Sequence, residues 1–90
     1  MGSAEQASEA LSQRQYSEAA RYASIAVLVR PENGGAWFTL ALARAALGDT
    51  RRSLEALEQA LAHGFSRDRI ESEPLLDKVR RKKEYAELMK

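Results

Sequence analysis

The stretch that decides the fold is GAWFTLALARAALGD, residues 35–49. Between Ala36 and Leu47 only Thr39 and Arg44 are polar, so a helix here is apolar on nearly every side. Such a helix is either packed by neighbours on several sides or keeps one face for a partner. The segment is much shorter than the roughly 20 residues that a membrane-spanning helix needs. We therefore predict a buried central helix and no membrane insertion.

The composition of the 90-residue chain is that of one globular domain. Alanine, leucine, glutamate and arginine are abundant, which favours an all-α fold. The formal net charge of +1 gives no global reason to expect binding to nucleic acid. The chain has no cysteine, which excludes disulfides and a thiol nucleophile. No signal-peptide pattern is visible, so a cytoplasmic location is the default expectation.

Apolar residues at helical spacing predict four helices before residue 65. Pro31 cannot lie inside the second helix, because proline lacks an N–H donor and disfavours helical geometry in the preceding residue. Gly48 follows the third helix, where a left-handed residue commonly ends a helix. Asp49 or Thr50 can then cap the fourth helix. The predicted helices cover residues 4–12, 16–29, 36–47 and 50–62.

The last part of the chain predicts shorter elements. Residues 66–73 are polar and are interpreted as a turn, and Pro74 suits the start of a helix. We expect a short helix after Pro74, a break near the basic run at residues 80–83, and a final helix that covers the others. No alternation typical of a β-strand occurs.

A period of 34 residues relates the first two helices to the next two. It superposes Ala7 on Ala41, Ala20 on Leu54, Ala23 on Leu57, Ala26 on Ala60 and Val27 on Leu61. The second unit resembles a tetratricopeptide repeat in Trp37, Leu40, Ala41, Gly48, Leu54, Leu57 and Ala60. The first unit is similar in Tyr16, Ala19, Ala26 and the closing Pro31. Departures from the family pattern are Ser3 for a large aromatic, Ser53 for alanine and Phe65 for the second closing proline.

The tail resembles the terminating segment that follows many bacterial tetratricopeptide arrays. The resemblance rests on residues 60–65, Glu73-Pro74-Leu75, Leu76 with Val79-Arg80, and Tyr85 with Leu88-Met89. Lys82-Lys83 stand where that pattern usually has Asp-Pro. Together the resemblances imply one domain over residues 1–90, a right-handed α-α superhelix. It would comprise repeat one (about 1–33), repeat two (about 34–65) and a C-terminal cap (about 66–90).

The residues that carry most enzyme chemistry are not arranged for it. His63 is the only histidine, so no usual zinc set can be assembled. Gly34-Gly35 lacks the downstream lysine and hydroxyl of a phosphate loop. The acidic residues are spread along helix exteriors without a paired-carboxylate arrangement. We expect no catalytic site, no metal and no cofactor.

In the tetratricopeptide family the first helix of each unit lines a concave groove that binds partner peptides. The resemblance places Ser8 and Leu11 from the first unit there, and Phe38, Leu42, Ala45 and Ala46 from the second. Phe38 and Leu42 would form an open apolar strip, while Trp37 points into the core. The alternative is that the terminal helix fills the groove and buries Phe38 against Tyr85, Leu88 or Met89. The family's carboxylate clamp is not carried over, because its positions hold Ala4, Ser8 and Thr39.

The strongest electrostatic feature is the run Arg80, Arg81, Lys82 and Lys83. We interpret it as a solvated face, with binding to an acidic peptide or to nucleic acid as alternatives. Arg44, the one charge on the central helix, is expected to pair with Glu71 or Glu73 of the tail. The expected function is a non-catalytic scaffold that binds a protein or peptide. The alternative is a capping or self-association unit at the end of a longer protein, with a homodimer formed through the apolar strip.

Overall fold

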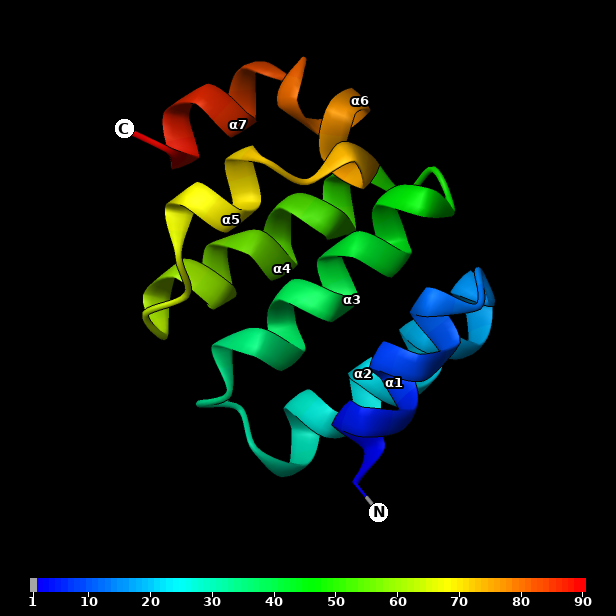
Figure 1. Ribbon diagram of the computed structural model, residues 1–90. Coiled ribbons are helices and arrows are strands. Elements are labelled where there is room, and N and C mark those ends of the chain that lie inside the picture. The colour runs from blue at the N-terminus through cyan, green and yellow to red at the C-terminus, as the bar shows by residue number, and fades with distance from the viewer. Residues whose placement is uncertain (1) are drawn as a thin grey trace.

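The computed structural model describes residues 2–90, and within that range the protein is all-helical and has no strand. Four long helices come first: α1 (Ser3–Ser12), α2 (Tyr16–Val29), α3 (Gly34–Ala46) and α4 (Thr50–Ala62). Four short elements follow: α5 (Arg67–Glu71), the 3-10 helix η1 (Pro74–Leu76), α6 (Asp77–Arg80) and α7 (Lys83–Leu88). Figure 1 shows α1 and α2 paired at one end, α3 and α4 in the middle, and α5 to α7 across the other end.

The four long helices confirm the prediction from apolar spacing: α2 and α4 have the predicted bounds, and those of α1 and α3 differ by at most two residues. Side-chain caps fix two of their starts. Asn33 accepts a hydrogen bond from the backbone N–H of Ala36 at 3.2 Å, and Asp49 accepts one from Arg52 at 3.2 Å. The predicted break in the basic run is also present, because α6 ends at Arg80 and α7 begins at Lys83.

The prediction of a turn over residues 66–73 is wrong, since α5 occupies most of that segment. The Ser66 side chain accepts a hydrogen bond from the N–H of Arg69 at 3.4 Å and so caps the short helix. Ile70 is completely buried beneath it. One capping side chain and one apolar anchor thus hold this segment as a helix against the core.

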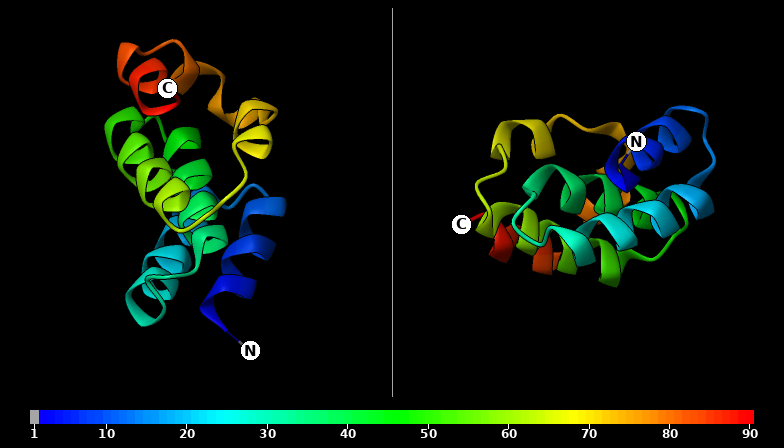
Figure 2. Two further views of the ribbon diagram at one scale, coloured as in Figure 1. Left: turned by 90° about the vertical axis from the view of Figure 1, so that its left-hand side faces the viewer. Right: turned by 90° about the horizontal axis from the view of Figure 1, so that it is seen from below.

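The central helix α3 organises the core, as predicted. It contacts α1, α2, α4 and η1, and the left panel of Figure 2 shows it between the α1–α2 pair and the C-terminal elements. The small residues Ala7, Ala19 and Ala23 are fully buried and allow the first helices to approach closely. Ser53, the polar departure from the repeat pattern, is also fully buried. Its hydroxyl donates to the carbonyl of Ala41 at 2.8 Å, so the position is satisfied.

Trp37 and Tyr85 lie at the border of the core and each carries a polar group there. Trp37 is half-buried at the edge of the core, and its indole N–H donates to the carbonyl of Pro31 at 2.7 Å. The prediction that it points into the core is therefore only partly met. Tyr85 of α7 is buried, and its hydroxyl has no hydrogen-bond partner within residues 2–90. Burial raises the pKa of this phenol, whereas the positive charge of Arg80 opposes the rise.

The turns between α1 and α2 and between α3 and α4 have the same hydrogen-bond pattern 34 residues apart. The paired bonds are Arg14 N–H to Leu11 (3.0 Å) with Gly48 N–H to Ala45 (3.0 Å), and Gln15 N–H to Ala10 (2.8 Å) with Asp49 N–H to Arg44 (2.9 Å). Each turn also contains one residue in the left-handed region, Arg14 at φ 61° and Gly48 at φ 85°. The sequence period is therefore matched by local backbone structure.

Substitutions at these two left-handed residues should change the free energy of unfolding in opposite directions. Arg14→Gly should raise the free energy of unfolding by about 0.5–1 kcal/mol, because glycine adopts this backbone without a Cβ penalty. Gly48→Ala should lower it by about 1–2 kcal/mol for the same reason. Urea denaturation followed by circular dichroism measures both. Equal effects of the two changes would contradict the assigned turn geometry.

No helix in residues 2–90 combines the length and apolar character that crossing a membrane requires.

Candidate functional site

The apolar strip expected at Phe38 and Leu42 is not open. Only 5% of Phe38 and 4% of Leu42 is exposed, so the prediction that these side chains wait for a partner is wrong. The ring of Phe38 stacks on Phe65, with centroids 4.3 Å apart and planes 22° from parallel. The ring that stacks on Phe38 thus comes from the segment before α5, and not from Tyr85 of the last helix. The predicted homodimer through this strip is therefore not supported, because the two side chains expose almost no apolar surface to a second copy.

Close approach of two backbones brings Phe65 into this position. A Cβ on Gly34 would lie 3.2 Å from the carbonyl oxygens of Ala60 and His63 and 3.4 Å from the Cβ of Phe65. The absence of a side chain at Gly34 therefore lets the start of α3 sit directly against the end of α4. The chain leaving α4 then passes over Phe38.

A pocket of about 320 Å³ lies beside the stacked rings, where α1, the start of α3 and α5 meet. We call it the α1–α3–α5 pocket. Among the six groove residues expected from the sequence, it brings together Ser8 and Phe38, while Leu11, Leu42, Ala45 and Ala46 do not line it. The lining residues are Ala4, Ser8, Asn33, Gly35, Ala36, Phe38, Thr39, Phe65 and Arg69.

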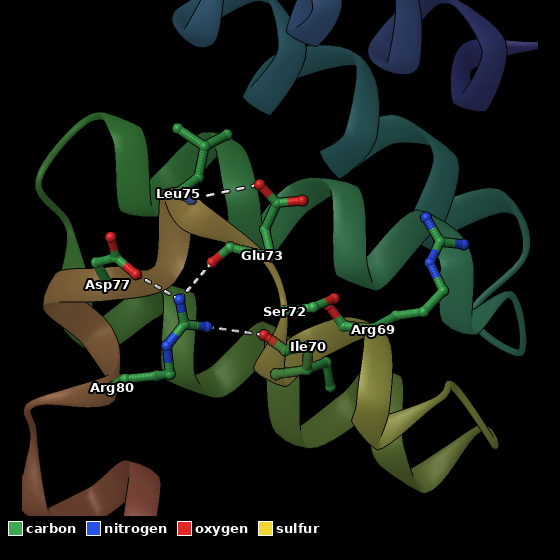
Figure 3. Close-up of polar contacts among 7 residues, drawn as sticks. All are labelled: Arg69, Ile70, Ser72, Glu73, Leu75, Asp77 and Arg80. Atoms are coloured by element: carbon green, nitrogen blue, oxygen red, sulfur yellow. Dashed lines mark hydrogen bonds and ion pairs between the residues drawn. The ribbon is translucent and has the colours of Figure 1, made fainter.

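Arg69 is the charged side chain of this pocket. Its guanidinium carbon lies 5.6 Å from the centroid of Phe38 and 5.4 Å from that of Phe65, so it covers both rings in cation–π geometry. Figure 3 shows Arg69 extending from α5 on the side away from Arg80. Within residues 2–90 no carboxylate lies within ion-pair distance of Arg69. The guanidinium thus lies over the rings, and its N–H donors face no carboxylate of residues 2–90.

Neutral polar groups surround this charge. The Asn33 side-chain oxygen is occupied in capping α3, which leaves its amide N–H groups to donate elsewhere. The Thr39 hydroxyl donates to the carbonyl of Gly35 at 3.1 Å and keeps its capacity to accept. Ser8 is exposed on α1 and adds another hydroxyl. Because donors dominate, the pocket suits a ligand rich in oxygen acceptors.

The basic run does not form one solvated patch. Arg80 is turned inwards, with its side chain 23% exposed. It donates to the carbonyls of Ile70 at 2.9 Å and Glu73 at 2.6 Å and pairs with the carboxylate of Asp77 (Figure 3). The prediction of a solvated face is wrong for Arg80. It holds for Arg81, Lys82 and Lys83, which are exposed.

Arg44 does not pair with the tail. Its guanidinium donates to the carbonyl of Arg52 at 3.3 Å, so the expected ion pair with Glu71 or Glu73 is wrong. Burial lowers the pKa of Arg44, and the positive charge of Arg52 acts in the same direction. The Glu73 carboxylate instead accepts a hydrogen bond from the N–H of Leu75 at 3.3 Å. Arg44 thus connects α3 to α4.

Within residues 2–90 no three histidine, aspartate or glutamate side chains are grouped so as to hold a metal ion. His63 lies exposed at the end of α4. Comparison with protein-family models, with curated proteins and with solved structures finds no match to this chain.

Proposed function

We propose that this chain is a non-catalytic protein-interaction module that binds a peptide segment of a partner in the α1–α3–α5 pocket. The observation that carries the proposal is Arg69, which lies over two stacked rings and has no carboxylate partner among residues 2–90. A carboxylate of the partner would accept paired hydrogen bonds from this guanidinium, the geometry in which arginine binds carboxylates best. Asn33 and Ser8 can donate to backbone carbonyls of the same segment.

The fold supports a tetratricopeptide-like interpretation of this module. The two helix pairs have matching turns at a spacing of 34 residues, and the pocket lies between α1 and α3, the first helices of the two units. In this proposal the pairs form a right-handed superhelix that α5 to α7 terminate. The carboxylate contact comes from α5, and not from the groove positions that form the family's clamp.

The electrostatic alternative has less support. The Arg80 guanidinium already donates to three groups of residues 70–77. An acidic peptide or a nucleic acid would therefore contact only the exposed Arg81, Lys82 and Lys83. Tyr85 is buried and cannot stack on a base. The α1–α3–α5 pocket combines charge, concavity and an aromatic surface, which the basic run does not.

The proposal predicts a specific effect of Arg69→Ala. A peptide-display library is selected on the wild-type protein, and the affinity of an enriched peptide is measured by fluorescence anisotropy. We expect enriched peptides to share an acidic residue, and Arg69→Ala to weaken binding at least about tenfold, as expected for loss of a charge-assisted pair. The matched control is Arg81→Ala, which removes an exposed arginine elsewhere and should leave the affinity unchanged.

Two outcomes would contradict this function. One is that selected peptides bind Arg69→Ala as tightly as the wild type. The other is that both arginine variants weaken binding equally, which would indicate a general charge effect. We expect Arg69→Ala to be folded, because the side chain is exposed and its loss costs little packing. Circular dichroism checks this.

A further inference from the structure

One exposed apolar surface lies on α2, outside the peptide pocket. Ile25, Leu28 and Val29 are 43%, 81% and 71% exposed. Their spacing of three and four residues places them on one side of the helix. Arg21 lies one turn before Ile25, and Arg30 follows the end of the helix; both are exposed. We call these five residues the α2 patch. It combines an apolar centre with two positive charges.

A groove of about 680 Å³ lies between α4 and α7. Leu54 and Leu88, which are half-buried, provide its apolar surface. Three exposed carboxylates line it as well, and none of them has an ion pair within residues 2–90: Glu55, Glu58 and Glu84. Gly48, Thr50, Arg51 and Lys82 complete the lining. We call this concavity the α4–α7 groove.

We propose that the α2 patch of one copy of this chain docks in the α4–α7 groove of a second copy. The apolar side chains of the patch meet Leu54 and Leu88, which reduces the apolar surface that both copies expose to water. Arg21 and Arg30 meet the three glutamates of the groove, which have no ion pair within residues 2–90 and outnumber its two cations, Arg51 and Lys82. Shape is compatible with the same arrangement, because the α4–α7 groove is concave and the exposed side of α2 is convex.

This contact joins two different surfaces, so it is heterologous. After each addition the assembly still presents one free patch at one end and one free groove at the other, so it grows into chains instead of stopping at a dimer. One helix in one groove is at the small end of protein interfaces, so association is weak and appears at high protein concentration. Because the charges are exposed, salt weakens it. The peptide pocket is not part of the contact, and the inference stands apart from the proposed function.

Sedimentation velocity tests the proposal, with the full chain measured from roughly 5 to 500 µM at low salt. The wild type should show a sedimentation coefficient that keeps rising with concentration. Leu28→Glu, in the patch, and the double variant Glu58→Arg with Glu84→Arg, in the groove, should each stay monomeric. Both sites are exposed, so the variants keep the fold. Glu9→Arg on α1 is the matched charge control and should associate like the wild type.

Mixing the two variants gives the sharpest result. Leu28→Glu keeps an intact groove and the double variant keeps an intact patch, so an equimolar mixture should form a dimer and nothing larger. A wild type that stays monomeric throughout would overturn the proposal. So would wild-type association that stops at a dimer, or a mixture that stays monomeric. Peptide binding through Arg69 should be normal in every variant, which separates failure of this proposal from failure of the proposed function.

Discussion

Arg80→Ala is expected to lower the free energy of unfolding by about 3 kcal/mol, the order of magnitude for a partly buried, charge-assisted hydrogen-bond network. Arg80 donates to the carbonyls of Ile70 and Glu73 and pairs with Asp77, so it ties α5 and the start of η1 to α6. Its removal leaves two carbonyl oxygens without this donor and weakens the packing of the C-terminal elements. Urea denaturation followed by circular dichroism measures the loss.

Arg81 provides the matched control for this prediction. It is the next residue along, carries the same charge and is exposed. Arg81→Ala should change the free energy of unfolding by no more than about 0.5 kcal/mol. Arg80→Lys should fall between the two, since an ammonium group cannot reproduce the planar fork of donors. If Arg80→Ala and Arg81→Ala are equally stable, the inward placement of Arg80 is incorrect.

Phe38→Glu is expected to abolish folding. The side chain is 5% exposed and stacked on Phe65, so the substitution places a carboxylate in the core and removes the stacking. The milder Phe38→Ala should cost about 3–4 kcal/mol, as for other buried phenylalanines, a large share of the stability of a domain of this size. The helical signal in circular dichroism and its thermal midpoint are the measurements.

An exposed leucine controls for the loss of apolar surface. Leu28 is 81% exposed, and Leu28→Ala should leave the thermal midpoint almost unchanged. A folded Phe38→Glu variant with a normal midpoint would mean that Phe38 lies on an open surface. That is the arrangement that the sequence predicted and the structure contradicts.

Helix positions could be predicted from the sequence because they depend on local signals. Apolar spacing, Pro31 and Gly48 mark the ends of helices without knowledge of what packs against them. The burial of Phe38 could not be predicted in this way, because it depends on the path of the chain after α4. That path in turn depends on Gly34, whose missing side chain allows the close approach.

The contacts of Arg69 and Arg80 could not be predicted from the sequence either, because they also depend on how the chain folds after α4. Arg80 donates mainly to backbone carbonyls, which every residue possesses, so the basic run alone does not reveal these contacts. Only the resemblance to the terminating segment, which includes Val79-Arg80, separates it from its three basic neighbours. Arg69 lies in a polar segment interpreted as a turn, and only the formation of α5 places it over two rings. Two signals for that helix were available in the sequence: Ile70 between charged neighbours, and Ser66 as a possible N-cap.

The most direct measurement of the central claim is a titration of ¹⁵N-labelled protein with a peptide selected on it, followed by the backbone amide chemical shifts. If the chain binds peptides in the α1–α3–α5 pocket, the largest shift changes fall on Ser8, Asn33, Thr39 and Arg69, and Arg69→Ala removes them. Amides of α4 and α7 should barely move. Shift changes concentrated at Arg81, Lys82 and Lys83, or on α2, with the pocket amides unmoved, would contradict the account.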